Sequence, residues 1–307
     1  MTQPAIVLNS VVKRFGQHEV LREMSLEVMP GQTFAFLGRN GAGKTTTIRM
    51  LLGLLAPDDG LVRVLGLNPT KCEIEVRRRV GYLAEDQVMF GWMTVEELIR
   101  FVGPFYPTWD HALAGRYARQ FDLPLRTKVK RLSKGESVRL GLLLALAHRP
   151  ELVILDDPAL GLDPIMRKEF NRDLITHLQG EGRTVFYSSH LLYEVEPVAD
   201  AVAILDRGVI VKQATTERLR DDVKRIILAP SALDRHRSSF SLLDVEHRGE
   251  ETAVVVDNAP TALAALEAAD EPHRTLDLNL DEIFEAYVTG RTGDGSDPAS
   301  VAMAVAS

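Results

Sequence analysis

The chain has 307 residues, of which 45% are hydrophobic and 26% charged, an ordinary balance for a folded protein of one large domain or two. Its net charge of −7 offers no basic surplus for DNA or RNA, and its single cysteine excludes an internal disulfide and disfavours a thiolate metal site. The start lacks the regions of a signal peptide, and the longest apolar run, 140–147, is far shorter than the roughly 20 residues of a membrane span, so we expect a cytoplasmic protein.

The N-terminal part alternates apolar and polar residues over 5–37, as half-buried strands do, and its last apolar run leads into a glycine-rich loop. This loop consists of Gly38, Arg39, Asn40, Gly41, Ala42, Gly43, Lys44 and Thr45 and precedes a predicted helix over 45–55. Its glycines let successive backbone N–H groups face one anion, while Lys44 can reach the outer phosphates and the Thr45 hydroxyl can bind Mg²⁺. The loop therefore predicts binding of a nucleoside triphosphate.

Two further strands, over 61–65 and 80–84, precede a stretch of helical periodicity. We expect helices over 94–102, 112–121 and 136–147, which together read as a helical insertion. Six of the chain's 19 aromatic residues fall within twenty residues just after Glu85, namely Phe90, Trp92, Phe101, Phe105, Tyr106 and Trp109. They form either a small core of the insertion or an interface with a partner protein.

Two acidic residues follow a buried strand over 152–155, in the run from Leu152 to Pro158. There Asp156 can hold Mg²⁺ through water and Asp157 can face an attacking water. Ahead of this strand, Ser133 and the Gly135 amide begin a predicted helix, where they could offer donors to a phosphate, or Ser133 could simply cap the helix.

Strands over 184–188, 201–205 and 209–213, with a helix over 164–178, indicate an α/β fold with a largely parallel sheet. His190 lies just past the first of these strands. Beyond 222, short strands and helices predict a small α+β appendage, and 291–307 has the composition of a disordered tail.

In this order and spacing, the motifs of residues 5–220 resemble the ATP-binding cassette, or ABC, ATPase family. The resemblance implies a P-loop NTPase core with an antiparallel β subdomain and a helical subdomain at about 85–147. We expect an ABC ATPase domain over 1–221, an accessory domain over 222–290 and a disordered tail over 291–307.

The resemblance also implies roles for individual residues. It assigns the Walker A loop to 38–45, the signature to 132–136, Walker B to 152–156, the D-loop to 159–163 and the switch histidine to His190. Phe15 matches the aromatic residue that stacks on adenine, although a strand Phe in the core would look the same. ATP would lie in a head-to-tail dimer, between Walker A with Thr46 of one subunit and Ser133, Gly135 and Glu136 of the other.

Some positions depart from the family pattern. The residue after Walker B is commonly Glu and here is Asp157, so we predict slow hydrolysis or a heterodimer with a more efficient second site. Where the family has a Gln that touches Mg²⁺, alignment favours Glu85 as a catalytic and metal-binding residue, with Gln87 as the alternative. Lys134 and Glu136 replace common signature residues, while Ser133 and Gly135 are kept.

The glycine-rich loop and the run Leu280-Asp281-Glu282-Ile283-Phe284 look like the drug, antibiotic and lipid exporter branch with separate membrane subunits. This resemblance implies ATP and Mg²⁺ as cofactors, a homodimer or heterodimer, an integral membrane permease as partner, and a peripheral position on the inner face of the cell membrane. The alternative is a soluble regulatory or repair ABC ATPase. A GTPase is disfavoured because the chain has no Asn-Lys-x-Asp motif.

Overall fold

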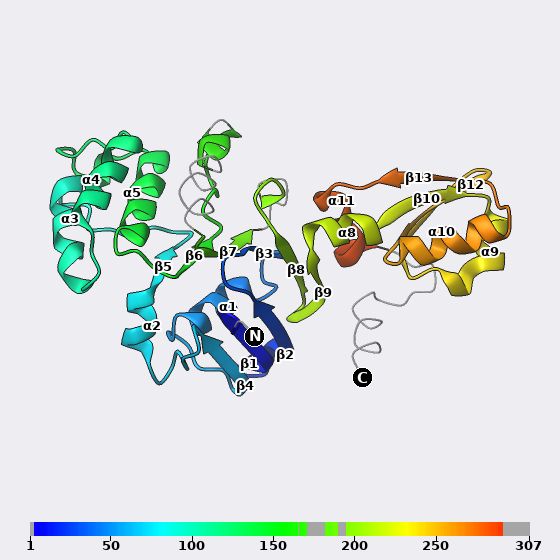
Figure 1. Cartoon of the computed structure of the whole chain (residues 1–307), viewed down its shortest axis with the longest axis horizontal. Helices are drawn as coiled ribbons and strands as arrows, with labels where there is room; N and C mark the ends of the chain where they lie inside the picture. Colours follow the sequence, from blue (N-terminus) through cyan, green and yellow to red (C-terminus); the bar gives the residue numbers. More distant parts are fainter. Residues whose placement is uncertain (1–2, 165, 171–181, 190–194, 291–307) are drawn as a thin grey trace.

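The computed structural model describes residues 3–164, 166–170, 182–189 and 195–290. Its centre is a six-stranded sheet in the order β5-β6-β7-β3-β8-β9 (Figure 1). Neighbouring strands are parallel except β8 and β9, which are antiparallel. The largely parallel sheet predicted from the sequence is thereby confirmed. The strands are β3 (Thr33–Gly38), β5 (Val80–Leu83), β6 (Leu152–Asp156), β7 (Thr184–Ser189), β8 (Ala201–Asp206) and β9 (Val209–Thr215).

A second, antiparallel sheet in the order β2-β1-β4 lies beside the central one, at the bottom of Figure 1. It is built from β1 (Ile6–Phe15), β2 (His18–Val28) and β4 (Asp59–Val64). The connections to the central sheet carry α1 (Lys44–Leu51) and α2 (Glu73–Arg79). This sheet is the expected antiparallel β subdomain.

The helical insertion forms the left end of the molecule in Figure 1 and consists of α3 (Val95–Val102), α4 (His111–Gln120) and α5 (Lys134–Leu146). Each helix begins where a polar side chain accepts a hydrogen bond from the first turn: Thr94, Asp110 and Ser133 are the N-cap residues. The first and third caps are capping boxes closed by Glu97 and Glu136. The helices start within two residues of the predicted positions.

The C-terminal part contains an antiparallel sheet in the order β11-β12-β10-β13. Its strands are β10 (Lys224–Leu228), β11 (Leu242–Arg248), β12 (Glu251–Val256) and β13 (His273–Asp277), and its helices are α8 (Thr216–Asp222), α9 (Pro230–His236), α10 (Ala259–Ala268) and α11 (Leu280–Thr289). The α+β character agrees with the prediction from the sequence. The helices α8 and α9 were not expected.

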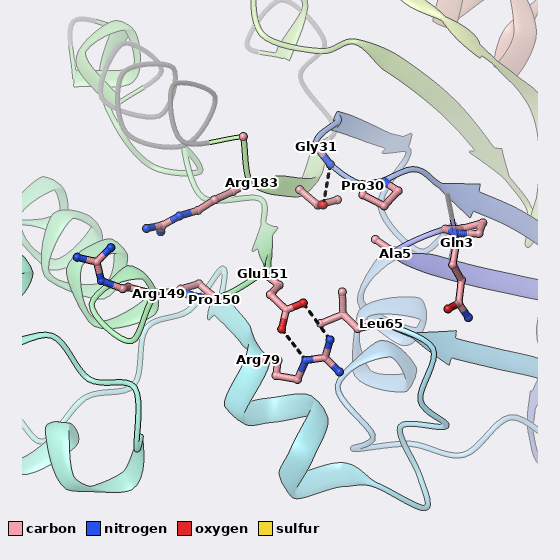
Figure 2. Close-up of a pocket in the computed structure, with 13 residues that line it drawn as sticks. Gln3, Ala5, Pro30, Gly31, Leu65, Arg79, Arg149, Pro150, Glu151 and Arg183 are labelled. Carbon is pink, nitrogen blue, oxygen red and sulfur yellow. Dashed lines mark hydrogen bonds and ion pairs between the residues drawn. The ribbon is translucent and has the colours of Figure 1, made fainter. Parts of the chain in front are cut away.

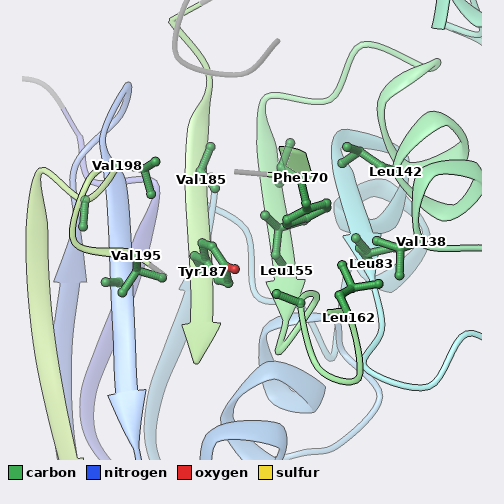
Figure 3. Close-up of a cluster of buried hydrophobic side chains, with 14 of the residues drawn as sticks. Leu83, Val138, Leu142, Leu155, Leu162, Phe170, Val185, Tyr187, Val195 and Val198 are labelled. Carbon is green, nitrogen blue, oxygen red and sulfur yellow. The ribbon is translucent and has the colours of Figure 1, made fainter. Parts of the chain in front are cut away.

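The central sheet separates two hydrophobic cores, because successive side chains of a strand point to opposite faces. On β3, Ala35 and Leu37 face the core shared with the helical insertion, while Phe34 and Phe36 face the core shared with the antiparallel sheet. Figure 3 shows the first of these cores between β6, β7 and α5. All residues of β3, β6, β7 and β8 are buried, as expected for strands covered on both faces.

The C-terminal part has a third core, formed by α9, α10 and one face of its sheet. Its last helix belongs elsewhere, because Ile283 and Tyr287 of α11 are buried in the large core of the central sheet. The C-terminal part is therefore anchored to the central sheet by α11. Within the described ranges, no helix is both long and apolar enough to cross a membrane.

Three predictions fall outside the described residues. They concern most of the helix over 164–178, of which residues 164 and 166–170 are helical, the position of His190, and the disorder of 291–307.

Candidate functional site

The parallel strands bring the predicted site residues to one edge of the sheet, where their carboxyl ends meet. The glycine-rich loop follows β3, Glu85 follows β5, and Asp156 and Asp157 lie at the end of β6. Since β5 adjoins β6 and only β7 lies between β6 and β3, segments far apart in the sequence converge here.

The loop after β3 is shaped for close backbone approach. Gly43 has φ +117°, and a Cβ at this position would lie 2.6 Å from Leu21 Cδ2, so both conformation and space require glycine. Gly43 is also the N-cap of α1 and provides no side-chain cap, which leaves the first N–H groups of the helix available to an anion. The loop and helix end thus form an anion cradle.

Lys44 lies at the base of this cradle, buried together with Asp157. Its ammonium group donates a 2.8 Å hydrogen bond to the Gly38 carbonyl and lies 3.6 Å from Asp157 Oδ2. Asp157 has φ +42°, which is uncommon for a residue with a side chain, and its N–H donates to the Ser188 carbonyl at 3.0 Å. The loop after β6 is thereby held so that its carboxylate faces Lys44.

Asp156 is buried at the end of β6, and its Oδ1 accepts a 2.9 Å hydrogen bond from Ser188 Oγ on the neighbouring strand. Burial raises the pKa of the Asp156 carboxyl; the Ser188 hydroxyl opposes this rise, and the charges of Asp157 and Glu85 add to it. Ser188 had no role in the sequence-based prediction. The signal that could have revealed it is the parallel pairing of Asp156 with Ser188.

The donor set suits Mg²⁺. The carboxylates of Asp157 and Glu85 lie close enough to act on the charge of Asp156, and the Lys44 ammonium group opposes their effect. A divalent cation would offset this excess of negative charge. Across the described residues, no group of three or more His, Cys, Asp or Glu forms a metal cage. Proteins commonly bind Mg²⁺ through one or two carboxylates together with phosphates.

A cleft of about 420 Å³ opens over the loop, a volume in the range of small-molecule sites. Its lining includes most of the predicted nucleotide-binding residues: Arg39, Asn40, Gly41, Gly43, Lys44, Thr45 and Thr46, together with Glu85, Asp157 and Val20. Gly38 and Ala42 are buried beneath the loop. The structure therefore brings the loop and two acidic residues into one cleft.

Of the two alternatives for the metal-contacting residue, Glu85 lines this cleft. The side chain of Gln87 packs instead against α5, where a Cβ at Gly141 would lie 2.7 Å from Gln87 Oε1. Phe15 lies at the end of β1 and outside the cleft lining, with its ring half exposed. It is accessible to a ligand and is not a core residue.

The predicted signature residues lie on the helical insertion, outside the cleft. Ser133 is exposed and caps α5: its Oγ accepts from the Glu136 amide at 3.2 Å and donates to Glu136 Oε2 at 2.8 Å. Gly135 is buried under Met166, whose Cε would lie 1.7 Å from a Cβ at this position. A side chain at Gly135 would displace the end of Met166. The signature residues do not line the cleft over the chain's own phosphate loop.

A second cleft, of about 560 Å³, lies at the opposite edge of the sheet (Figure 2). Its charges are already satisfied in two places: Arg79 forms two hydrogen bonds with Glu151, at 2.6 and 2.9 Å, and Arg149 binds Asp110. It lies at the amino ends of the strands, away from the acidic residues and the glycine-rich loop. We assign it no role.

The family described as "ABC transporter" matches residues 21–160 of the chain. The bacitracin transport ATP-binding protein BcrA of Bacillus licheniformis is 33% identical over 245 residues, which cover 75% of this chain and 80% of BcrA. The uncharacterized ABC transporter ATP-binding protein YdbJ of Bacillus subtilis is 30% identical over 286 residues, 91% of each chain. A solved ATP-binding subunit of an ABC transporter superposes with a TM-score of 0.64 at 27% identity, covering 71% of this chain and 92% of that one.

Proposed function

Since this chain belongs to the ABC transporter family of ATP-binding proteins, we propose that it is the ATPase subunit of an exporter, coupling Mg-ATP binding and hydrolysis to transport by a separate membrane subunit. The observation that carries this proposal is the cleft in which the loop around Lys44 and Thr45 faces Glu85 and Asp157. It combines anion donors for phosphates with oxygen ligands for the accompanying cation.

The chemistry of the site is phosphoryl transfer to water, which depends on positioning and charge stabilisation more than on covalent steps. Lys44 and the N–H groups at the start of α1 would hold the phosphate oxygens, and Thr45, Asp156 and Glu85 would bind Mg²⁺. The cation would neutralise charge that develops on the transferred phosphoryl group. Asp157 would orient the attacking water. His190 of the switch motif would contact the terminal phosphate.

A head-to-tail dimer would complete the site. Ser133, Gly135 and Glu136 lie on the helical insertion and outside the chain's own cleft, with Ser133 exposed to solvent. A second subunit that presents this surface to the cleft would add the donors which a single chain lacks there. Phe15, exposed beside the loop, would stack on the adenine base. Homodimer and heterodimer both fit this arrangement.

An exposed aromatic cluster supports a protein partner. We define it as Phe90, Trp92, Phe101 and Phe105, whose rings contact one another with centroid distances of 5.4–6.1 Å. All four side chains are exposed, Trp92 to 66%. Clustered exposed aromatic residues mark interaction sites, and we propose that the membrane subunit docks here, which would place the ATPase on the inner face of the cell membrane.

The test is purification of the tagged chain from membranes of its host under gentle conditions, with ATP trapped, followed by mass spectrometry. We expect a polytopic membrane protein in stoichiometric amount and ATP hydrolysis that is lost in the Lys44→Ala variant. Recovery of an active ATPase without a membrane partner would overturn the transporter proposal and favour a regulatory or repair ATPase. Absence of ATP binding would overturn both.

A further inference from the structure

The end of β1, which carries Phe15, is irregularly paired. The register of β1 with β2 shifts between Val11 and Lys13 and again between Lys13 and Arg14. Such irregularities leave ladder groups in need of other partners. The Arg14 N–H is donated to a carboxylate, Asp58 Oδ2, at 2.6 Å.

Asp58 holds this segment through three contacts. Its Oδ1 accepts a 2.9 Å hydrogen bond from Lys13 Nζ, its Oδ2 accepts from Arg14, and its own N–H donates to the Val12 carbonyl at 2.9 Å. The Lys13 hydrogen bond and the Arg14 amide lower the pKa of the Asp58 carboxyl, so it is ionised at neutral pH. One carboxylate thus fixes both a backbone amide and a neighbouring ammonium group.

The ammonium group links this carboxylate to the aromatic ring. Lys13 Nζ lies 5.5 Å from the centroid of the Phe15 ring, within the range of a cation–π contact, and the Lys13 side chain is nearly buried. The ring itself remains half exposed. Asp58 therefore orients Lys13, and Lys13 restrains one side of the Phe15 ring while part of the ring stays open to solvent.

The same segment adjoins the phosphate loop. Lys13 pairs with Leu21 across the β1–β2 ladder, and Leu21 packs directly on Gly43. Val20, which directly precedes Leu21 on β2, lines the cleft. A nucleotide with its phosphates on the loop would thus have its base on the side where Phe15 lies.

We propose that Asp58 is a positioning residue for the base of the bound nucleotide, holding Lys13 and Arg14 so that Phe15 is fixed for stacking. The inference rests on the proposed function, in which the phosphates occupy the loop and Phe15 meets the base. Because Asp58 acts through Phe15, its loss should weaken the base-dependent part of binding and leave the phosphate-dependent part intact.

The experiment compares calorimetric binding of Mg-ATP and of inorganic tripolyphosphate, which has the phosphates without a base, to the full chain. Phe15→Ala should weaken ATP binding by about five- to a hundredfold, the range of base–aromatic stacking. Asp58→Ala should weaken ATP binding by about three- to tenfold and change tripolyphosphate binding less than about twofold. Asp58→Asn, which keeps an acceptor for the Arg14 amide, should be intermediate.

The control is Glu96→Gln, which removes an exposed ion pair with Arg100 of 3.0 Å and should change neither affinity. Tripolyphosphate binding also reports that each variant is folded. If Phe15→Ala loses affinity for ATP alone and Asp58→Ala matches the wild type, the role of Asp58 is wrong. Equal loss of both ligands in Asp58→Ala and Asp58→Asn also overturns it, whereas an unaffected Phe15→Ala contradicts the proposed base site itself.

Discussion

At the scale of single residues, we propose that the acidic side chain after β6 limits the rate of ATP hydrolysis. Asp157 is one methylene shorter than the Glu that the family resemblance leads us to expect here, and its carboxylate lies 3.6 Å from Lys44. Its backbone is held by Ser188, so the side chain has little freedom to advance into the cleft. A displacement of about 1 Å from the reacting water can cost on the order of a hundredfold in rate.

We expect Asp157→Glu to raise steady-state ATP turnover by roughly ten- to a hundredfold, because the longer side chain brings the carboxylate closer to the attacking water. The measurement is phosphate release at saturating Mg-ATP. Asp59→Glu, the same substitution at an exposed position outside the cleft, should leave turnover unchanged. An unchanged or lower rate in Asp157→Glu would show that Asp157 does not limit hydrolysis.

Site residues could be predicted from the sequence where a short motif contains the residue types that the chemistry needs. Lys44 and Thr45 could be predicted from their spacing alone, and the structure places both in the cleft. The roles of Ser188 and Asp58 could not, because they depend on cross-strand neighbours 32 and 44 residues away in the chain. The alternative between Glu85 and Gln87 likewise needed the path of the loop after β5, which local sequence does not determine.

At the scale of secondary structure, the six aromatic residues between positions 90 and 109 divide into two groups. Phe90, Trp92, Phe101 and Phe105 form the exposed aromatic cluster, whereas Tyr106 and Trp109 pack inward, with the Tyr106 ring 4.1 Å from that of His148. The core alternative therefore holds for Tyr106 and Trp109, whereas the interface alternative stays a prediction for the exposed aromatic cluster. Helical periodicity predicted the helices of this region but not which aromatic side chains would be covered.

We expect Trp92→Asp to reduce the amount of protein bound to host membranes by about tenfold or more, the effect of losing an interface anchor. Nucleotide affinity and melting temperature should stay close to those of the wild type, because the side chain is exposed. Trp109→Ala is the matched aromatic change and should lower stability. Unfolding of Trp92→Asp would assign the cluster to the core of the insertion.

His148 joins the helical insertion to the central sheet and gives this junction a pH dependence. Burial lowers its pKa from 6.5 to about 4, so the unfolded chain binds more protons between these values. Its contribution to the free energy of unfolding is complete above pH 6.5 and falls by up to about 3 kcal/mol as the pH drops towards 4. His148 lies just past the end of α5, and its ring packs on the ring of Tyr106.

Replacing the His148 imidazole should flatten the dependence of the free energy of unfolding on pH. We expect His148→Phe to lose less stability than the wild type between pH 6.5 and 4.5, as measured by urea unfolding at each pH. His111→Gln, at an exposed histidine of the same insertion, should follow the wild-type curve. Parallel curves for His148→Phe and the wild type would mean that His148 does not titrate differently in the two states.

The helices that the sequence did not reveal are short. α2, α8 and α9 have seven residues each, fewer than two full turns, so an apolar stripe cannot repeat along them. The predicted helices have eight residues or more, so more than two turns display the period. The starts of α3, α4 and α5 are set by the N-cap residues Thr94, Asp110 and Ser133, of which the sequence analysis had considered only Ser133 as a cap.

At the scale of the whole molecule, α11 ties the C-terminal unit to the ATPase sheet. Ile283 is fully buried in the core that also contains residues of the helical insertion. The sequence indicated a separate appendage, because its strands and helices form a pattern of their own. That the last helix packs back on the central sheet is a tertiary contact with no local signal.

We expect Ile283→Ala to destabilise the whole chain by about 2–5 kcal/mol, the usual cost of truncating a buried aliphatic side chain. Both tryptophans lie in the helical insertion, so their fluorescence reports unfolding at a distance from the mutation. Glu285→Ala, an exposed change in the same helix, should have little effect. If tryptophan fluorescence were unmoved in Ile283→Ala, the C-terminal unit would unfold independently.

The strand order of the central sheet has a consequence during synthesis on the ribosome. β3 leaves the ribosome early, but its neighbours β7 and β8 begin about 150 residues later, as Thr33 pairs with Val185 and Phe34 with Ala201. At roughly 5–20 residues per second, this apolar strand waits on the order of ten seconds for its partners. The nascent chain therefore exposes the strand that will carry the phosphate loop, and translation speed and chaperone binding will influence the yield of folded protein.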